Sequence, residues 1–465
     1  MNILNKIGAF FMSLFYKYNI ESVTGVKANL SADMVNKIDL WNLILASRAP
    51  WQTGGNSCGV VETIIGKLAN SVNEEIEISA ENKDLEKVIK KLNESSKEII
   101  QNVIGVGGCI VRPVYKNNKP QFEIIKLGNY IPTAYDLDGT LLSCVITKKI
   151  NEGEKEFLLL EKHEYKNNTH SVETELYKIK NDVLTKTTLD ACSITAGLTP
   201  FYKWENVAAP FIVEFRNREP NRVDGSPVPC ALWQNTENLI KDADEQYSRI
   251  TWEQEGGQML VFADEDLFKQ TQKKKLNGEF AEKRLNPTLN KLVVKLSGNG
   301  TGEEKIQTHA PALRTDPQVK AFNEILRRIE LSWNIGKGTL SDLEDAAQTA
   351  TQYRGGKNAL YNMIDSLESE LEEKYKNVAY IFAYMLTVYQ GIKFDDSILI
   401  TYNEASRKDP DTIRAAALAE VQNNIISREE YRQRVFGEDE KTAAEKTPAE
   451  TASGGIGGMF DFSRG

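Results

Sequence analysis

Apolar residues recur at helical spacing along the first hundred residues, and this pattern predicts three helices. The first covers 31–45, with Ser31 as its N-cap. The second covers 57–69, and the third, which is long and charged, covers 82–103. Between them, residues 74–79 alternate as in a short strand. The residues predicted to face the core from the last two helices are Val60, Val61, Ile64, Ile65, Leu68, Leu85, Val88, Ile89, Leu92, Ile99 and Ile100.

Between about 107 and 215 the pattern changes to the alternation that is typical of β-strands. Its apolar runs are separated by N-N-K, D-G, N-E-G and N-N sequences, which favour tight turns. Strands joined by such short turns form hairpins, so the sheet is predicted to be largely antiparallel. The predicted strands are 109–115, 120–127, 140–150, 155–165, 172–179 and 211–217.

Helical periodicity returns in the second half of the chain, and the fold class is therefore predicted to be α+β. A lysine-rich α/β insert at 258–310 interrupts the helices, and 398–402 reads as a short strand. Gly355 and Gly356 lie near the head of the longest helix and together cost roughly 2 kcal/mol, which predicts a kink. The tail, 442–465, is glycine-rich and of low complexity. The predicted helices are 231–255, 317–335, 348–391 and 409–435.

The composition excludes several functional classes. A net charge of −9 argues against a protein that coats DNA, because such proteins need a basic surface. The five cysteines are far apart and include no C-x-x-C pair, which indicates reduced thiols rather than a disulfide framework. The three histidines are placed in loops and form no metal-binding motif. No metal and no other cofactor is therefore predicted.

Residues 3–18 are the one membrane-like segment of the sequence. Their apolar run is too short to span a bilayer, and no signal-peptide cleavage site follows it. We expect an amphipathic helix that docks on the body of the protein or on a neighbouring subunit, and no membrane contact.

Two segments resemble catalytic motifs. The sequence D-L-D-G-T at 136–140 is similar to the nucleophile loop of haloacid-dehalogenase-type phosphatases, in which the two aspartates, here Asp136 and Asp138, do the chemistry. That chemistry needs a parallel strand that ends at the first aspartate. Here Pro132 weakens such a strand, and a hairpin turn is the preferred interpretation. The glycines of 105–108 follow a helix and precede a strand, the reverse of a phosphate loop, so they are predicted to form a tight turn.

The segment 326–359 carries the strongest resemblance to a known family. An amphipathic helix stops at Gly336-Lys337-Gly338, a short acidic segment follows, and a much longer helix begins. The sequences R-R-I-E before the break, G-T-L-S-D in the loop and T-A-T-x-x-x-x-x-K at the head of the long helix resemble portal proteins of tailed bacteriophages. Segments 38–46, 64–78 and 243–257 match the same pattern in order. Leu343-Glu344-Asp345 and the glycine pair of the long helix depart from it.

The resemblance implies a ring of about twelve subunits around a channel at one capsid vertex. Double-stranded DNA would pass through it without sequence-specific contacts. The implied partners are other copies of the chain, the large subunit of the terminase, the major capsid and scaffold proteins and a head–tail adaptor. The implied parts are a wing (1–225), a first stem helix (226–257), a clip (258–315), a second stem helix (316–336), a tunnel loop (337–347), a long wing helix with a strand (348–405), a crown helix (406–440) and a flexible tail (441–465).

The predicted tunnel loop, 337–347, is the first candidate site. In a ring, its carboxylates would repeat in every subunit and would repel phosphates, while Lys337 and two hydroxyl groups would offer weak contacts to the DNA backbone. A capping box between Ser341 and Glu344 explains part of the same pattern equally well. The residues proposed to face the DNA are Lys337, Thr339, Ser341, Asp342, Glu344 and Asp345.

The insert supplies the second candidate site. Lys273, Lys274 and Lys275 stand out in a chain that is acidic overall, and they are predicted to meet DNA or an acidic partner at one end of the channel. A solvated lysine face that prevents aggregation of strand edges remains an equal alternative.

Three further interpretations of the whole chain remain open: an ordinary helical hairpin in a globular domain, a phosphatase that uses Asp136, and a capsid-associated scaffold without a channel. We expect no catalytic activity, because no nucleophile, metal or phosphate motif fits its context.

Overall fold

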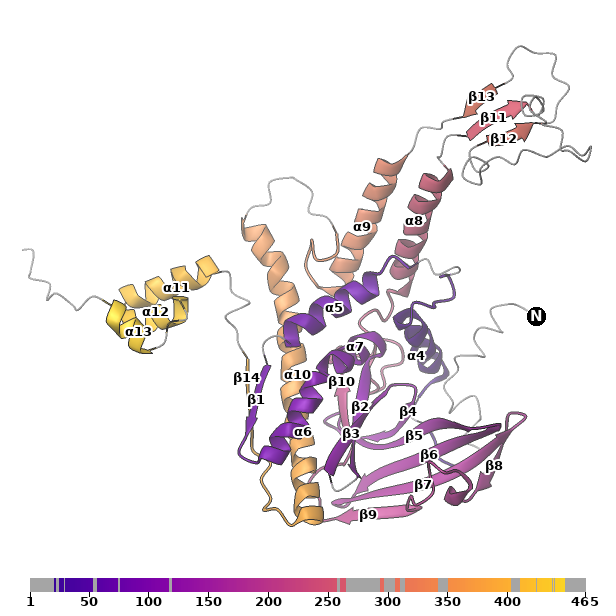
Figure 1. The fold of residues 1–465 in the computed structure, drawn as a ribbon, viewed down its shortest axis with the longest axis vertical. Coiled ribbons are helices and arrows are strands. Elements are labelled where there is room, and N and C mark those ends of the chain that lie inside the picture. Colours follow the sequence, from indigo (N-terminus) through magenta and orange to yellow (C-terminus); the bar gives the residue numbers. More distant parts are fainter. Residues whose placement is uncertain are drawn as a thin grey trace, which may run out of the picture. The chain divides into compact units, whose positions relative to one another are not determined.

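The computed structural model describes residues 21, 25–28, 30–52, 57–73, 76–116, 119–256, 260–264, 293–296, 306–309, 314–341, 350–402, 410–423, 425–436, 438 and 440–447. Contacts divide the chain into two units. One unit comprises Met1–Glu74 and Ile78–Leu399, and the other comprises Glu75–Glu77 and Ile400–Gly465. Helices alternate with mainly antiparallel sheets, as Figure 1 shows, and the predicted α+β class is confirmed.

The N-terminal helices agree largely with the sequence pattern. Helix α4 (Ala32–Leu45) begins at Ser31, whose hydroxyl accepts a hydrogen bond from the Met34 N–H at 3.1 Å. Helix α5 (Val60–Asn73) starts three residues later than predicted and ends four residues later. Its five predicted core residues are all buried. The segment 3–18 lies outside the described residues.

The single helix predicted over 82–103 is wrong, because the chain breaks at Ser95. The break separates α6 (Lys83–Glu94) from α7 (Ser96–Val106). The Ser95 N–H bonds to the Leu92 carbonyl, only three residues back, which closes a tight last turn. Helix α6 buries one face, whereas α7 is buried on most sides. The break thus lies where the chain passes from a half-buried helix to a largely buried one.

Two sheets follow, built from hairpins as predicted. Strands β2 (Gly108–Lys116), β3 (Lys119–Lys126) and β10 (Val213–Arg216) form an antiparallel sheet in the order β10-β2-β3. The larger sheet has six strands, in the order β4-β5-β6-β7-β8, and β9 also pairs with β7. Its strands are β4 (Tyr130–Tyr135), β5 (Leu141–Glu152), β6 (Lys155–Lys166), β7 (Thr169–Lys180), β8 (Val183–Thr187) and β9 (Phe201–Glu205).

The sequence pattern missed β4, β8 and β9. Pro132 lies in β4, which is at the edge of the sheet, and the register shifts next to it. An edge strand tolerates proline because one side of its backbone needs no ladder hydrogen bond. The placement of the histidines in loops is also wrong. His163 lies in β6, His170 in β7 and His309 in β13 (Ile306–His309).

The next pair of helices is α8 (Glu237–Gly256) and α9 (Thr315–Trp333). The predicted start of α8 at 231 is wrong, since 232–235 form turns in which Trp233 is fully buried. The predicted end of α9 at 335 is also wrong. Asn334 adopts the left-handed conformation (φ 53°) directly after Trp333, so asparagine rather than glycine ends this helix.

Between α8 and α9 lie the strands of the insert. Strands β11 (Leu260–Asp264), β12 (Val293–Leu296) and β13 form a sheet in the order β12-β11-β13. β11 is parallel to β12 and antiparallel to β13. The insert that the sequence predicted to be α/β therefore contains β-strands among its described residues.

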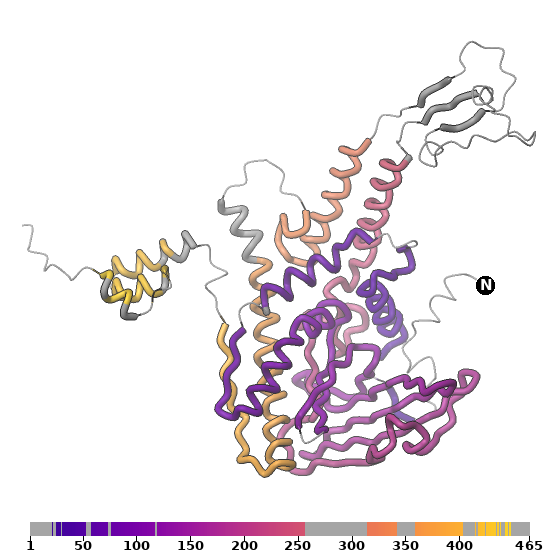
Figure 2. The backbone as a smooth tube through the Cα atoms, viewed as in Figure 1, coloured from indigo at the N-terminus to yellow at the C-terminus, as the bar shows by residue number. Residues whose placement is uncertain are grey.

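The longest helix, α10 (Ala350–Gln390), spans 41 residues and remains helical through Gly355 and Gly356. The predicted strand after it is confirmed as β14 (Ile398–Tyr402), which pairs with β1 (Ile76–Ala80) in a two-stranded sheet (Figure 2).

The second unit contains three helices among its described residues, not the single helix predicted over 409–435. These are α11 (Pro410–Gln422), α12 (Arg428–Phe436) and α13 (Glu440–Lys446). Ser427 and Glu430 form a capping box that starts α12: each side chain accepts a hydrogen bond from the backbone N–H of the other residue. Helix α13 extends into the tail, 441–465, that was predicted to be flexible.

Candidate functional site

Helices α8 and α9 pack side by side as an antiparallel pair (Figure 1). At one end, the rings of Trp233 and Trp333 lie 6.0 Å apart, and the Trp333 Nε1–H donates to Thr236 Oγ1 at 2.9 Å. At the other end, the Arg314 guanidinium donates to both carboxylate oxygens of Glu253, at 3.1 and 3.0 Å. The insert leaves from this second end, so the paired helices form a stalk between the insert and the core.

Two buried carboxylates join α8 to the N-terminal region. Glu237 accepts hydrogen bonds from Lys37 Nζ at 2.7 Å and from Trp41 Nε1 at 2.9 Å. Both partners belong to α4. This contact fixes the first turn of α8 against the core.

Asp244, about two turns further along α8, is 2% exposed. Its carboxylate accepts hydrogen bonds from Trp51 Nε1 at 2.9 Å, Gln52 Nε2 at 2.7 Å and the Cys58 N–H at 2.8 Å. Burial, together with the nearby charge of Asp244, raises the pKa of the Cys58 thiol to about 12. The Cys58 thiol is therefore protonated at neutral pH.

A third buried carboxylate, that of Glu330 in α9, holds the residues that follow the helix. One of its oxygens accepts from the N–H groups of Leu340 at 2.5 Å and Ser341 at 2.7 Å. The other accepts from the Gly338 N–H at 3.1 Å and the Ser341 hydroxyl at 2.9 Å. The chain thus folds back onto the last turns of α9, and Gly336 and Gly338 supply the positive φ angles, 82° and 85°, that this fold requires.

The structure describes three of the six predicted DNA-facing residues. Lys337 is exposed. The Thr339 hydroxyl lies 2.7 Å from the Ile335 carbonyl and 2.9 Å from that of Gly336, and Ser341 is 6% exposed and bonded to Glu330. The other three, Asp342, Glu344 and Asp345, lie outside the described residues, as do Lys273, Lys274 and Lys275.

Comparison with known families supports the resemblance to portal proteins. The family model described as "Phage portal protein, SPP1 Gp6-like" matches residues 67–454, which include both stalk helices, the segment after α9 and the long helix α10. The chain belongs to this family. No curated protein matches it.

Portal proteins are structural components of the phage capsid rather than catalysts. In agreement with this, Asp136 and Asp138 belong to a hairpin turn, as the sequence predicted. The Asp136 N–H donates to the Thr140 carbonyl at 2.9 Å, and Gly139 has a φ of 78°. The turn joins the antiparallel strands β4 and β5, so the parallel strand that a phosphatase nucleophile would need is missing at this position.

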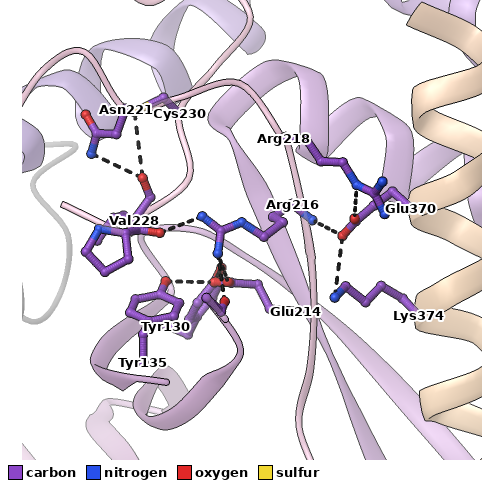
Figure 3. A network of polar contacts seen from close by, with 12 residues as sticks. Tyr130, Tyr135, Glu214, Arg216, Arg218, Asn221, Val228, Cys230, Glu370 and Lys374 are labelled. Atoms are coloured by element: carbon purple, nitrogen blue, oxygen red, sulfur yellow. Dashed lines mark hydrogen bonds and ion pairs between the residues drawn. The ribbon is translucent and has the colours of Figure 1, made fainter. Parts of the chain in front are cut away.

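One buried glutamate of this portal protein, Glu214, was not indicated by any pattern in the sequence. Glu214 in β10 is 5% exposed and accepts hydrogen bonds from the hydroxyls of Tyr130 at 2.8 Å and Tyr135 at 3.0 Å (Figure 3). Burial raises the pKa of Glu214, although Arg216 lies 3.9 Å from its other oxygen. The contact joins β10 to β4, the edge strand of the large sheet.

The same segment is also tied to α10 through a second carboxylate. Glu370, 4% exposed, accepts from the Arg216 N–H at 3.1 Å and from Arg218 Nε at 2.9 Å, while Lys374 lies 4.0 Å away (Figure 3). The networks of Glu214 and Glu370 both join residues more than 75 positions apart, so no local sequence pattern indicates them.

His163 and His170 lie side by side in the large sheet, with His163 Nδ1 3.2 Å from His170 Nε2. The Phe211 N–H donates to His170 Nδ1 at 3.4 Å, so neutral His170 carries its proton on Nε2 and donates to His163. Burial lowers the pKa of both rings, that of His170 to about 3. Within the described residues, no group of three or more potential metal ligands occurs, and no helix is both long and apolar enough to cross a membrane.

Proposed function

We propose that the chain forms an oligomeric ring at one capsid vertex and that double-stranded DNA is packaged and ejected through its channel. The observation that carries this proposal is the match to phage portal proteins over 67–454, which includes the α8–α9 stalk and the segment that follows it. The role requires no catalytic step by this chain. A separate terminase supplies the motor, since the sequence contains no G-x-x-x-x-G-K-[ST] nucleotide-binding motif.

Each part of the chain has a place in this proposal. Helices α8 and α9 form the stem, and the insert, 258–315, forms a clip that docks the terminase large subunit during packaging and a head–tail adaptor afterwards. The N-terminal region and α10 form a wing that meets the major capsid and scaffold proteins. The helices after 406 form a crown. The ring assembles in the host cytoplasm and remains in the virion.

The segment 337–347 is proposed to line the narrowest part of the channel. The intramolecular bonds of Thr339 and Ser341 leave Lys337 as the exposed polar side chain among the described residues of this segment. Asp342, Glu344 and Asp345, repeated around the ring, would repel phosphates. Weak contact of this kind suits DNA passage, because tight binding of the phosphates would slow the movement of DNA through the channel.

Electron microscopy of the purified protein tests the ring. The expected images are closed rings with a central hole, in the presence of scaffold or capsid protein if the chain alone stays monomeric. Particles without a hole under both conditions would contradict the proposal and favour a scaffold without a channel.

A charge reversal tests the channel segment. Asp342→Lys with Asp345→Lys is expected to slow or stall packaging and to leave ring assembly unchanged, because lysines at these positions would bind phosphates. The control, Asp138→Lys with Asp190→Lys, makes the same change of charge at exposed positions elsewhere. Equal packaging by both double variants, or a ring structure with 337–347 on its outer rim, would refute the channel role.

A second charge reversal tests the clip. Replacement of Lys273, Lys274 and Lys275 by glutamate is expected to impair terminase docking and packaging in rings that still assemble. Replacement of the exposed Lys87, Lys97 and Lys178 by glutamate is the matched control. If the clip variant packages DNA at the wild-type rate, these lysines serve only solubility.

A further inference from the structure

The contacts of Glu330 suggest more than a helix cap. Its side chain is 1% exposed, yet it is the acceptor of four hydrogen bonds from residues eight to eleven positions later in the chain. A carboxylate removed from water in this way is stable only while those donors stay in place. Glu330 and residues 338–341 therefore form one interdependent unit.

A second element holds the same residues from another side. Lys67, in α5, donates its Nζ–H to the Thr339 carbonyl. The next residue of α5, Leu68, is fully buried and anchors this turn of the helix in the core. The Thr339 carbonyl is thus bonded to α5 while the N–H groups on either side of it are bonded to α9, so both faces of this short stretch are fixed.

We infer that Glu330, assisted by Lys67, is a positioning residue that fixes residues 338–341 as an immobile base, so that any displacement of the segment 337–347 by passing DNA begins after Ser341. This inference rests on the proposed function and refines it. The geometry assigns Gly336 and Gly338 to a fixed turn, whose positive φ angles present the backbone N–H groups to the Glu330 carboxylate.

Amide hydrogen exchange of the full-length protein tests the base directly. The amides of Gly338, Leu340 and Ser341 are expected to be protected in the wild type. In Glu330→Ala they should exchange about 100-fold faster, because all three lose their acceptor. Glu330→Gln, which keeps one acceptor oxygen, is expected to fall between the two. The control is Glu324→Gln, on the same helix at an exposed position, and it should leave these amides unchanged.

If Glu330→Ala also loses protection in distant strands, it has unfolded, and Ser341→Ala then serves as the test. That variant removes only the hydroxyl bond, and its Leu340 and Ser341 amides are expected to exchange several-fold faster. Exchange of the three amides in the wild type at the rate of an unprotected peptide would overturn the inference. So would equal rates in the wild type and both Glu330 variants.

Packaging by Glu330→Gln rings separates this inference from the proposed function. Slower packaging together with faster exchange supports the link between the base and DNA passage. Faster exchange with unchanged packaging would overturn that link, although the rings seen by microscopy would still support the portal role. Absence of rings in the wild type would instead refute the proposed function, whatever the exchange rates.

Discussion

Asp244 is expected to be one of the main determinants of stability where the α8–α9 stalk meets the N-terminal region. Asp244→Ala removes the shared acceptor of Trp51 Nε1, Gln52 Nε2 and the Cys58 N–H. The three donors come from the segment that links α4 to α5, and this segment is held to α8 by these contacts. The substitution therefore removes the bonds that hold this segment to α8 without altering any apolar contact of the core, while Glu237 still joins α8 to α4.

The size of the effect follows from the number and kind of bonds. A hydrogen bond to a charged acceptor contributes about 1.5–3 kcal/mol. The three donor residues are only half-buried, and water replaces part of each bond, so about 1–2 kcal/mol is expected for each of them. The alanine variant should thus lose about 3–6 kcal/mol of unfolding free energy. Asp244→Asn retains one acceptor oxygen and should lose less than half of that.

The assay is guanidinium unfolding followed by tryptophan fluorescence at one fixed protein concentration, because association contributes to stability. Asp242→Ala, an exposed position on the same helix, is the matched control and should stay within about 0.5 kcal/mol of the wild type. Thiol alkylation gives a second readout. Loss of Asp244 removes one of the causes that raise the Cys58 pKa, so this thiol should react faster at pH 8.

Equal unfolding free energies for Asp244→Ala and Asp242→Ala would refute the reasoning. That result would mean that water satisfies the three donors as well as the carboxylate does. Unchanged alkylation of Cys58 would separately show that burial alone suppresses its reactivity.

Three further predictions concern other parts of the fold. Burial lowers the pKa of His170 to about 3, so its contribution to stability is complete above about pH 6.5 and declines as the pH falls towards 3. The free energy of thermal unfolding at pH 7.5 and at pH 5 should therefore differ by about 2 kcal/mol through His170, and His170→Phe should reduce this difference; the pKa of His163, also lowered by burial, acts in the same direction. Gly107→Ala should destabilise far more than Gly153→Ala in urea titrations, since both have positive φ but only at Gly107 would a Cβ meet backbone atoms, 2.6 Å from the Pro229 oxygen. Ser427→Ala removes the cap of α12 and should lower the free energy of unfolding by about 1 kcal/mol. Unfolding of the full chain followed by circular dichroism measures this, and unchanged helix content with unchanged stability would contradict it.

The sequence alone was sufficient at several places where the decisive interaction is local. The Ser31 cap, the hairpin turn at 136–140 and the glycine turn after α7 each depend on residues within a few positions of one another. The alternation of 107–215 predicted the antiparallel strands for the same reason: strands joined by short turns pair with their neighbours. The ordered motifs of 326–359 were enough to indicate the portal family, which the family match confirms.

The tertiary structure decided the features that depend on distant partners. The break at Ser95 arises because α6 and α7 pack in different surroundings, and the propensities of 82–103 do not encode those surroundings. The roles of Asp244 and Glu214 depend on donors that lie 79 to 193 positions away in the sequence. Ser341 is an intermediate case. The residues next to Ser341 suggested a local helix cap, yet its hydroxyl bonds to Glu330 in α9. This is because Gly336 and Gly338, both with positive φ, fold the chain back onto the end of α9. The residue type determines which hydrogen bonds a side chain can form, but the fold determines which partner it bonds to.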